Sequence, residues 1–274
     1  MREPARDSVS EMPKVTVVTV VYNRVSEIEQ TMRSVLDQTY PSIEYVVIDG
    51  GSTDGTADII RKYADRLYYW ASEPDAGVYD AMNKGIQKAT GDWINFLNCG
   101  DYYYDTDTVA DLVTCVDDVD FLYGDVFSID SDGSPLRRER AREVNRTAIK
   151  NGVPACHQAM FVRRSMCPRY DTRYTISADL DWVLQIFRQN RVRVRRFTER
   201  PVVYYRVGGL SSFRYEGSFQ SIRIIRNHFG RFDAFLRLPL LARWLIAAWV
   251  KRAFGITTLK KLFLAPRRHR PGMR

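Results

Sequence analysis

The sequence is poor in the residues that build disulfide frameworks and zinc sites. Its four cysteines (Cys99, Cys115, Cys156 and Cys167) form no C-x-x-C pair, and only three histidines occur in 274 residues. Secreted disulfide scaffolds and zinc modules need a denser spacing of these residues. We therefore expect free thiols in a reducing compartment.

Long apolar runs are missing as well. The most apolar segment, residues 238–250, contains Arg243 and follows Arg237, whereas a membrane-spanning helix needs about 20 apolar residues. Residues 1–12 contain no apolar stretch of the kind found in a secretory signal. We expect a disordered leader there, no spanning helix and a cytoplasmic protein.

Two common nucleotide-binding fingerprints are also absent. Neither G-x-x-x-x-G-K-[ST] nor G-x-G-x-x-G occurs, so the phosphates of a bound nucleotide would have to be neutralised by other groups. A glycine-rich N-terminal loop with a basic residue, as a nucleotidyltransferase would need, is not visible either.

The charge of the chain is unevenly distributed. Residues 218–274 contain 13 Lys and Arg against the single acid Asp233, while residues 1–217 contain 28 basic and 32 acidic residues. Basic segments of this kind are typical of contact with anionic lipid head groups. Because no nucleic-acid-binding module accompanies the basic residues, we expect no nucleic-acid partner.

The basic segment, residues 216–274, is expected to be helical and amphipathic. Its mixture of Trp, Leu and Phe with Arg and Lys is typical of helices that lie on a membrane surface. Alternatively, these helices pack on the preceding domain and leave their arginines solvated. We expect peripheral association with the inner face of the cytoplasmic membrane. The apolar residues concerned are Phe232, Phe235, Leu236, Leu240, Leu241, Trp244, Leu245 and Trp249.

Apolar runs alternate with amphipathic stretches in the first hundred residues. The runs at 15–21, 43–48, 67–71 and 93–97 predict buried strands. The stretches between them have helical spacing, and Ser26 with Glu29 predicts a capping box for the first helix. Strands are also predicted at 121–123, 159–162 and 202–205, helices at 107–115 and 179–188, and a hairpin with a mobile loop within 126–155. This order is typical of a doubly wound, mostly parallel α/β sheet.

Polar clusters follow three of the predicted parallel strands, at 22–23, 49–51 and 98–101. The carboxyl ends of parallel strands meet at one edge of a sheet, where ligands bind. Asp49 could accept a hydrogen bond from uracil or from a ribose hydroxyl, and Gly50 would let a nucleotide approach the backbone. The alternative is a tight turn in which Asp54 favours the helix N-terminus.

Asp101 and His157 are the candidate metal ligands. A lone carboxylate plus phosphate oxygens suits Mg²⁺ or Mn²⁺, and an imidazole favours Mn²⁺. Asp101 could instead cap the next helix, and His157 could be a structural histidine.

Asp179 is the candidate general base. Asp179 and Asp181 lie about 200° apart on a helix, so only one of them can face a cleft. Asp179 lies at the predicted helix start, where it could act on a bound hydroxyl or serve only as a first-turn charge.

The chain resembles family two of the inverting glycosyltransferases, enzymes with the GT-A fold that use nucleotide sugars. The resemblance covers about residues 13–215, and its closest subgroup assembles bacterial exopolysaccharides or glycolipids. It rests on TVVTVVYNR (16–24), YVVIDGGSTDGT (45–56), SEPDAGVYDAMNKG (72–85), GDWINFLNCGD (91–101), HQAMF (157–161) and SADLDW (177–182).

This resemblance implies roles for individual residues. Asp49 matches the acid that recognises uracil, Asp101 the last acid of the Asp-x-Asp metal motif, and Asp179 the catalytic base. His157 and Arg206 match segments that help to hold the metal or the diphosphate. The remaining matches are Thr19, Val21, Tyr22, Gly50 and Asn83 for the nucleotide, and Asp80, Asn98 and Gly100, with Arg206, for the donor sugar and diphosphate.

Three positions depart from the family pattern. Asn98-Cys99-Gly100-Asp101 offers one carboxylate where several are usual, Ala178 replaces the usual Glu, and Met82 replaces an Arg. These departures leave an alternative function open, that of a scaffold protein of the same fold that binds nucleotide sugars without turnover. The main expectation is an inverting, metal-dependent glycosyltransferase using a UDP-sugar, with a nucleotide half (13–101) and an acceptor half (102–215), and a saccharide or lipid-linked acceptor.

Overall fold

The computed structural model describes residues 12–144, 146–150, 152–153, 155–189, 191–208, 215–231 and 233. The chain divides into two compact units, residues 1–212 and 213–274. Each unit is described below by itself.

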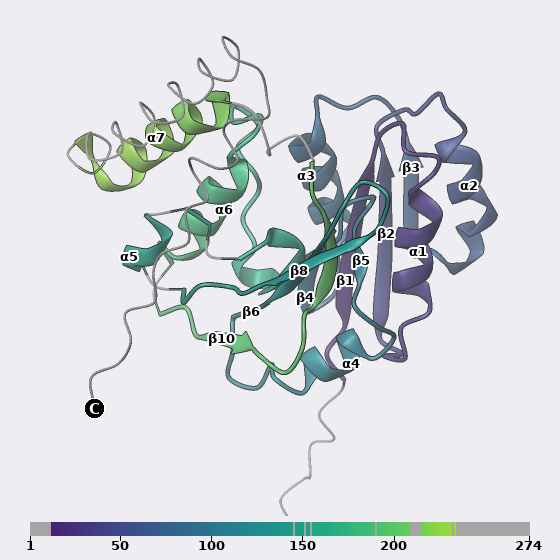
Figure 1. Cartoon of the computed structure of the whole chain (residues 1–274), viewed down its shortest axis with the longest axis horizontal. Coiled ribbons are helices and arrows are strands. Elements are labelled where there is room, and N and C mark those ends of the chain that lie inside the picture. Colours follow the sequence, from purple (N-terminus) through teal and green to yellow (C-terminus); the bar gives the residue numbers. More distant parts are fainter. Residues whose placement is uncertain are drawn as a thin grey trace, which may run out of the picture. The chain divides into compact units, whose positions relative to one another are not determined.

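The first unit contains a seven-stranded sheet with the strand order β10-β6-β9-β4-β1-β2-β3 (Figure 1). Only β9 runs antiparallel to its neighbours β4 and β6; the other pairings are parallel. The predicted doubly wound, mostly parallel sheet is therefore confirmed. The strands are β1 (Val15–Val21), β2 (Ile43–Asp49), β3 (Tyr69–Ser72), β4 (Trp93–Phe96), β6 (Phe121–Gly124), β9 (Met160–Arg163) and β10 (Val194–Phe197).

Helices cover both faces of this sheet because β1 is apolar on both faces. Val15, Val17 and Val21 pack with Ile28 and Met32 of α1 in one buried cluster. On the opposite face, Val18 touches Gly85 of α3, so closely that a Cβ there would come within 2.3 Å of Val18. Figure 1 accordingly shows α1 and α3 on either side of the β1–β2 pair. The helices of this unit are α1 (Ile28–Leu36), α2 (Thr56–Lys62), α3 (Val78–Lys88), α4 (Thr108–Val113), α5 (Arg146–Ile149) and α6 (Ala178–Ile186).

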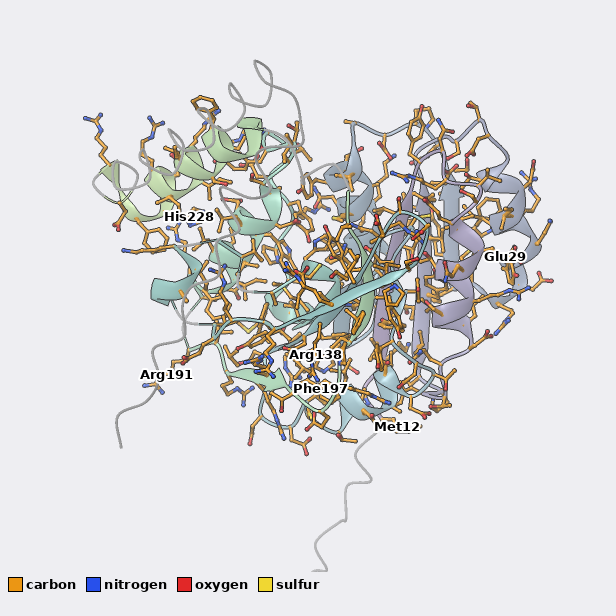
Figure 2. All side chains as sticks on the ribbon, viewed as in Figure 1. Met12, Glu29, Arg138, Arg191, Phe197 and His228 are labelled. Atoms are coloured by element: carbon orange, nitrogen blue, oxygen red, sulfur yellow. The ribbon has the colours of Figure 1, made fainter. Side chains whose placement is uncertain are left out.

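The predicted capping box at the start of α1 is wrong. The helix begins at Ile28, and Glu27 at its N-cap makes no side-chain cap. The backbone N–H groups of Glu27 and Ile28 both donate to the carbonyl of Arg24, which forms a turn before the helix. The Glu29 carboxylate instead accepts hydrogen bonds from Tyr63 and Arg33, and Glu29 is labelled on α1 in Figure 2.

A second sheet of four strands has the order β5-β11-β7-β8. Its strands are β5 (Tyr102–Tyr103), β7 (Val126–Ile129), β8 (Pro135–Glu139) and β11 (Val203–Arg206). The β7–β8 pair is the hairpin expected within 126–155. The short strand β5 and the arginine-rich strand β10 were not predicted. Phe197, labelled in Figure 2, ends β10 as a buried residue.

Asp125 links the two sheets, because it lies between the end of β6 and the start of β7. Its buried carboxylate accepts hydrogen bonds from Arg138 of β8 at 2.9 Å and from Arg196 of β10 at 2.8 Å. Its backbone carbonyl accepts from Val202, just before β11. Burial favours the neutral acid, but these arginines and the N–H of Ala141 outweigh burial and lower the pKa of Asp125.

The second unit contains α7 (Tyr215–Phe229) among the described residues. Within the described parts of the chain, no helix has the length and apolar character needed to cross a bilayer. The predicted membrane-surface residues, Phe232 and those from Phe235 to Trp249, lie outside the described residues.

Candidate active site

The segments that follow β1 and β2 meet at the carboxyl edge of the large sheet. Gly50 donates its backbone N–H to Val21, Asn23 donates to the Ser52 hydroxyl at 2.7 Å, and the Asn23 side chain accepts from Thr53 at 2.9 Å. The segment after β4 joins them, because Cys99 donates to the carbonyl of Val20. The three polar clusters named from the sequence therefore lie at one edge.

Asp49 is fully buried at this edge, with an exposed fraction of 0%. Its Oδ1 accepts from the Ser52 hydroxyl at 2.5 Å, and its Oδ2 accepts from the backbone of Ser52 at 3.0 Å and the hydroxyl of Ser72 at 2.5 Å. The carboxylate thus holds the turn after β2 against the end of β3.

Tyr22 and Gly50 lie side by side above Asp49. The Tyr22 side chain is 60% exposed, and one of its ring carbons lies 3.4 Å from the point that a Cβ on Gly50 would occupy. An exposed aromatic ring of this kind is a surface on which a planar base can stack.

Other predicted nucleotide and donor residues have partners within the protein. Thr19 is buried and its hydroxyl bonds the Tyr45 hydroxyl. The Asn83 amide both donates to and accepts from the backbone of Tyr170, and Asp80 accepts from the N–H of Ala76 at 3.1 Å. In this structure Thr19 and Asn83 organise the fold around the edge.

Asp101 is almost completely buried behind β4. Its Oδ1 accepts from the backbone N–H of Arg206 at 2.8 Å and its Oδ2 from the Gln158 amide at 2.6 Å. Burial raises the pKa of Asp101 to about 7, although these hydrogen bonds and His157 act in the opposite direction. Gly100, with a φ of +98°, forms the turn that brings Asp101 there.

His157 lies between Asp179 and Asn98. Its Nδ1 is 3.3 Å from Oδ2 of Asp179, and its Nε2 is 3.1 Å from Nδ2 of Asn98. Burial alone would lower the pKa of His157, but the Asp179 carboxylate and then Asp101 outweigh it and raise the pKa. A histidine that donates Nδ1–H to a carboxylate holds that carboxylate in one orientation.

Two buried oxygen atoms beside His157 have no hydrogen-bond partner in the structure, Oδ1 of Asp179 and Oδ1 of Asn98. Buried polar atoms are normally satisfied, so unpaired oxygens on both sides of one imidazole indicate a place for an external donor or a cation. Asp181, two residues further along α6, turns away and accepts from Gln185. Of the two acids, Asp179 is therefore the one beside His157.

Arg206 closes the site from β11. Its guanidinium donates to the carbonyls of Ser131 at 2.6 Å and Asp130 at 3.2 Å, and its Cδ and Nε lie 3.9 Å from the space above Gly100. The positively charged guanidinium of Arg206 is therefore held next to the Asn98–Asp101 turn.

The donor set fits a divalent cation that takes most of its ligands from a phosphate. Asp101 uses only part of its acceptor capacity and Asn98 offers an unpaired oxygen. In a His157 that donates from Nδ1, the one lone pair on Nε2 accepts from Nδ2 of Asn98 at 3.1 Å, so the Asn98 amide would have to turn before Nε2 could bind a cation. No cluster of three His, Cys, Asp or Glu side chains suited to a metal occurs among the described residues. Mg²⁺ typically binds through one or two carboxylates plus substrate phosphates.

Sequence reasoning missed two residues of the site. Gln158, which holds Asp101, lies in a short 3₁₀ turn (His157–Ala159) that no apolar spacing indicated. Asp75, whose Oδ2 would lie 2.5 Å from a Cβ on Gly50, follows β3 in a loop read only as a sequence motif.

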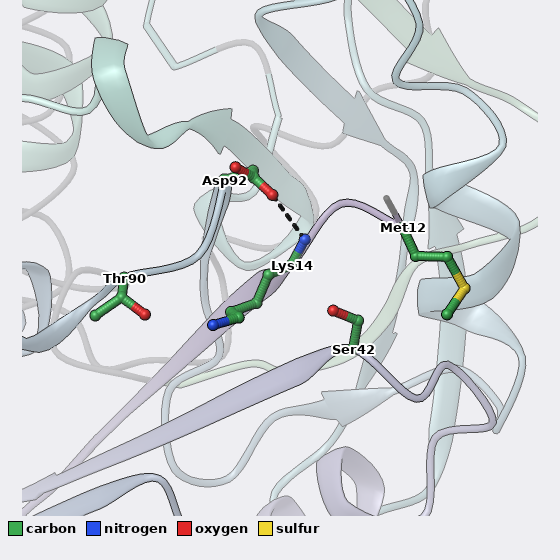
Figure 3. A pocket seen from close by; sticks show the side chains of 5 residues that line it. All are labelled: Met12, Lys14, Ser42, Thr90 and Asp92. Atoms are coloured by element: carbon green, nitrogen blue, oxygen red, sulfur yellow. Dashed lines mark hydrogen bonds between the residues drawn. The ribbon is translucent and has the colours of Figure 1, made fainter. Parts of the chain in front are cut away.

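A hollow at the other end of the sheet is not part of this site. It is lined by Met12, Lys14, Ser42, Thr90 and Asp92 (Figure 3). There the backbone of Lys14 donates to Asp92 at 2.8 Å. Since Lys14 precedes β1, this hollow lies at the amino edge of the sheet.

Solved structures share the fold of this chain. TarS of S. aureus, residues 1–349 in complex with UDP-GlcNAc, matches with a TM-score of 0.60 at 19% identity, over 92% of this chain and 76% of that fragment. The mannosyltransferase PcManGT from Pyrobaculum calidifontis, in complex with GDP-Man and Mn²⁺, matches with a TM-score of 0.59 at 19% identity, over 92% of this chain and 79% of its own.

Sequence comparison goes further. A "PGL/p-HBAD biosynthesis glycosyltransferase" of Mycobacterium bovis is 33% identical over 210 residues, 73% of this chain and 80% of that protein. The "Putative teichuronic acid biosynthesis glycosyltransferase TuaG" of Bacillus subtilis is 39% identical over 92 residues, 32% of this chain and 36% of its own. The family description "Glycosyl transferase family 2" matches residues 16–170. This chain therefore belongs to glycosyl transferase family 2, as its sequence motifs predicted.

Proposed function

We propose that the protein transfers a sugar from a nucleotide sugar, with UDP favoured, to a saccharide or lipid-linked acceptor, and that the anomeric centre is inverted. The observation that carries the proposal is Oδ1 of Asp179, a buried carboxylate oxygen without a partner whose other oxygen faces His157. Such an oxygen suits the proton of an acceptor hydroxyl.

The reaction would be a single displacement. Oδ1 of Asp179 accepts the proton as the acceptor oxygen forms a bond to C1 of the sugar. The bond from C1 to the diphosphate oxygen breaks on the opposite face, and its electron pair leaves with the nucleoside diphosphate. Arg206, next to Gly100, would stabilise the charge that develops on the leaving group.

Asp101 and His157 would hold a divalent cation, Mn²⁺ or Mg²⁺, with Asn98 beside them. When bound, such a cation supplies positive charge for the leaving diphosphate. Support comes from the donor set of these residues and from the Mn²⁺ in the PcManGT complex.

The relatives favour cell-surface glycolipid or polysaccharide synthesis. Two of them carry names that refer to PGL/p-HBAD and teichuronic acid biosynthesis, and TarS was solved with UDP-GlcNAc. We propose residues 13–215 as the transferase domain, with its nucleotide half at 13–101. Residues 216–274 would hold the enzyme on an anionic surface at the inner face of the cytoplasmic membrane, where a lipid-linked acceptor would be available.

The proposal is tested by the release of nucleoside diphosphate from UDP-, GDP- and dTDP-sugars with Mn²⁺, Mg²⁺ or EDTA, using a membrane lipid extract as acceptor. We expect release from one donor, stopped by EDTA and by Asp101→Ala. Tight binding of a nucleotide sugar without release under any condition would instead identify a scaffold protein, the function that the single carboxylate of residues 98–101 leaves open.

A further inference from the structure

If the protein uses a nucleotide sugar, as proposed above, the turn after β2 must recognise the donor's base. The acid expected to contact the base, Asp49, has no exposed surface, and both of its oxygens are engaged by Ser52 and Ser72. Because Asp49 is also fully buried, a base could reach it only if the side chains that cover it moved. A different carboxylate lies on the accessible side of the same turn.

That carboxylate belongs to Asp75. A Cβ built on Gly50 would lie 2.5 Å from Oδ2 and 3.2 Å from Cγ of Asp75. Gly50 does not adopt the left-handed conformation that favours glycine, unlike Gly51 with its φ of +82°. Residue 50 must therefore lack a side chain because of the space beside it, and not because of its backbone angles. The Asp75 carboxylate fills that space.

The loop that carries Asp75 is held firmly on the turn after β2. Glu73 donates its N–H to the carbonyl of Asp49 at 3.0 Å, and the Lys84 ammonium donates to the carbonyl of Pro74 at 3.1 Å. Oδ1 of Asp75 accepts from the N–H of Gly77 at 2.8 Å, which orients the carboxylate and directs Oδ2 toward Gly50. The position of Oδ2 is thus determined by the backbone on both sides.

Tyr22 borders the same glycine. One carbon of its ring lies 3.4 Å from the point that a Cβ on Gly50 would occupy, and the residue is 60% exposed. A half-buried carboxylate and an exposed aromatic ring therefore lie next to each other over Gly50, which is buried. A planar base stacked on the ring would present its edge to Oδ2 of Asp75.

We propose that Asp75 is the residue that selects the nucleobase of the donor, by accepting a hydrogen bond from a ring N–H at the edge of the base. Uracil and thymine offer N3–H there, and guanine offers N1–H. Cytosine and adenine present a bare ring nitrogen at that position, which a carboxylate repels. The site therefore binds UDP, dTDP or GDP and rejects CDP and ADP.

The test is calorimetric binding of UDP and CDP to the full chain and to Asp75→Asn. An asparagine keeps an oxygen for Gly77 and so preserves the loop, but its NH₂ group can face Gly50. We expect UDP to bind roughly 10- to 100-fold more weakly, as expected for the loss of a charged hydrogen bond, while CDP binds equally well or better. The matched control is Glu73→Gln in the same loop, since the Glu73 side chain pairs with Lys84 and only its backbone, which the substitution keeps, contacts the turn.

A second variant separates base selection from loop folding. Asp75→Ala should lose the preference for UDP over CDP, and Gly50→Asp combined with Asp75→Ala should restore it, because a Cβ on residue 50 starts 2.5 Å from the position of Oδ2 of Asp75 and carries a new carboxylate into that region. Full UDP preference in both Asp75→Asn and Asp75→Ala would overturn this inference alone. A wild-type protein that binds no nucleoside diphosphate would overturn the proposed function with it.

Discussion

At the scale of single residues, the main feature of the site is that two of its buried oxygen atoms have no hydrogen-bond partner. Asp179, His157 and Asn98 form a half-buried row with two buried oxygens that are unpaired. Sequence motifs indicated all three residues, but they could not indicate that His157 faces Asp179, because the two lie on separate elements. Nor could they indicate that Asp49 is sealed by serines, since spacing carries no information about which side chains close over an acid.

His157 is expected to act through Asp179. In His157→Ala the carboxylate would lose the group 3.3 Å from its Oδ2, and misplacement of a reacting group can cost about 100-fold in rate. We predict that kcat falls by roughly 10- to 100-fold while UDP affinity measured in EDTA stays within twofold. His228→Ala in α7 is the matched control. An unchanged kcat in His157→Ala would show that His157 does not position the base.

At the scale of elements, the loop that carries Asp75 leads directly into α3, and α3 packs closely on the sheet. Gly85→Ala usually favours a helix by up to about 1 kcal/mol, but here the new methyl group would come within 2.3 Å of Val18. We predict a net destabilisation of about 1–3 kcal/mol from overpacking, measured by urea unfolding. Gln87→Ala, an exposed position on α3, is the control. Stabilisation by Gly85→Ala would contradict the packing described for α3.

Asp125 makes the junction of the two sheets sensitive to acid. Its pKa is lowered in the folded protein because Arg196, Ala141 and Arg138 together outweigh its burial. A lowered pKa stabilises the fold above the unfolded value of about 3.9, and this stability is lost as the pH falls through the folded value. We predict that Asp125→Asn lowers the unfolding midpoint at pH 7 and that the difference from wild type shrinks below about pH 4. A difference that stays constant down to pH 3 would exclude this role.

At the scale of the whole molecule, much of the large sheet could be predicted because its strands are continuous apolar runs. β1 was predicted with its observed bounds, and β2, β4 and β6 ended within one residue of the prediction. The failures have physical causes. β5 spans two residues, and β10 reads VRRF because it lies at an edge, where Arg196 pairs with Asp125. Arg193, just before the strand, pairs with Asp120. An edge strand with charged partners has no apolar signature.

The same limit applies to the site. Residues at strand ends could be predicted to converge, because parallel topology alone brings those ends together. The roles of Gln158 and Asp75 depend on loops that fold over the edge of the sheet. The spacing of apolar residues in the sequence does not indicate which distant segments such loops contact. The contacts of these two residues therefore follow from the three-dimensional structure and not from the sequence pattern.

The most direct test of the central claim is a comparison of Asp179→Asn with wild type in sugar transfer and in donor binding. The amide cannot take the acceptor proton, so we predict a loss of about 10²- to 10⁴-fold in kcat, with donor affinity within a few-fold of wild type. Asp181→Asn, in the same helix but facing Gln185, should keep most of the activity. Transfer by Asp179→Asn at the wild-type rate would contradict the assignment of Asp179 as the base.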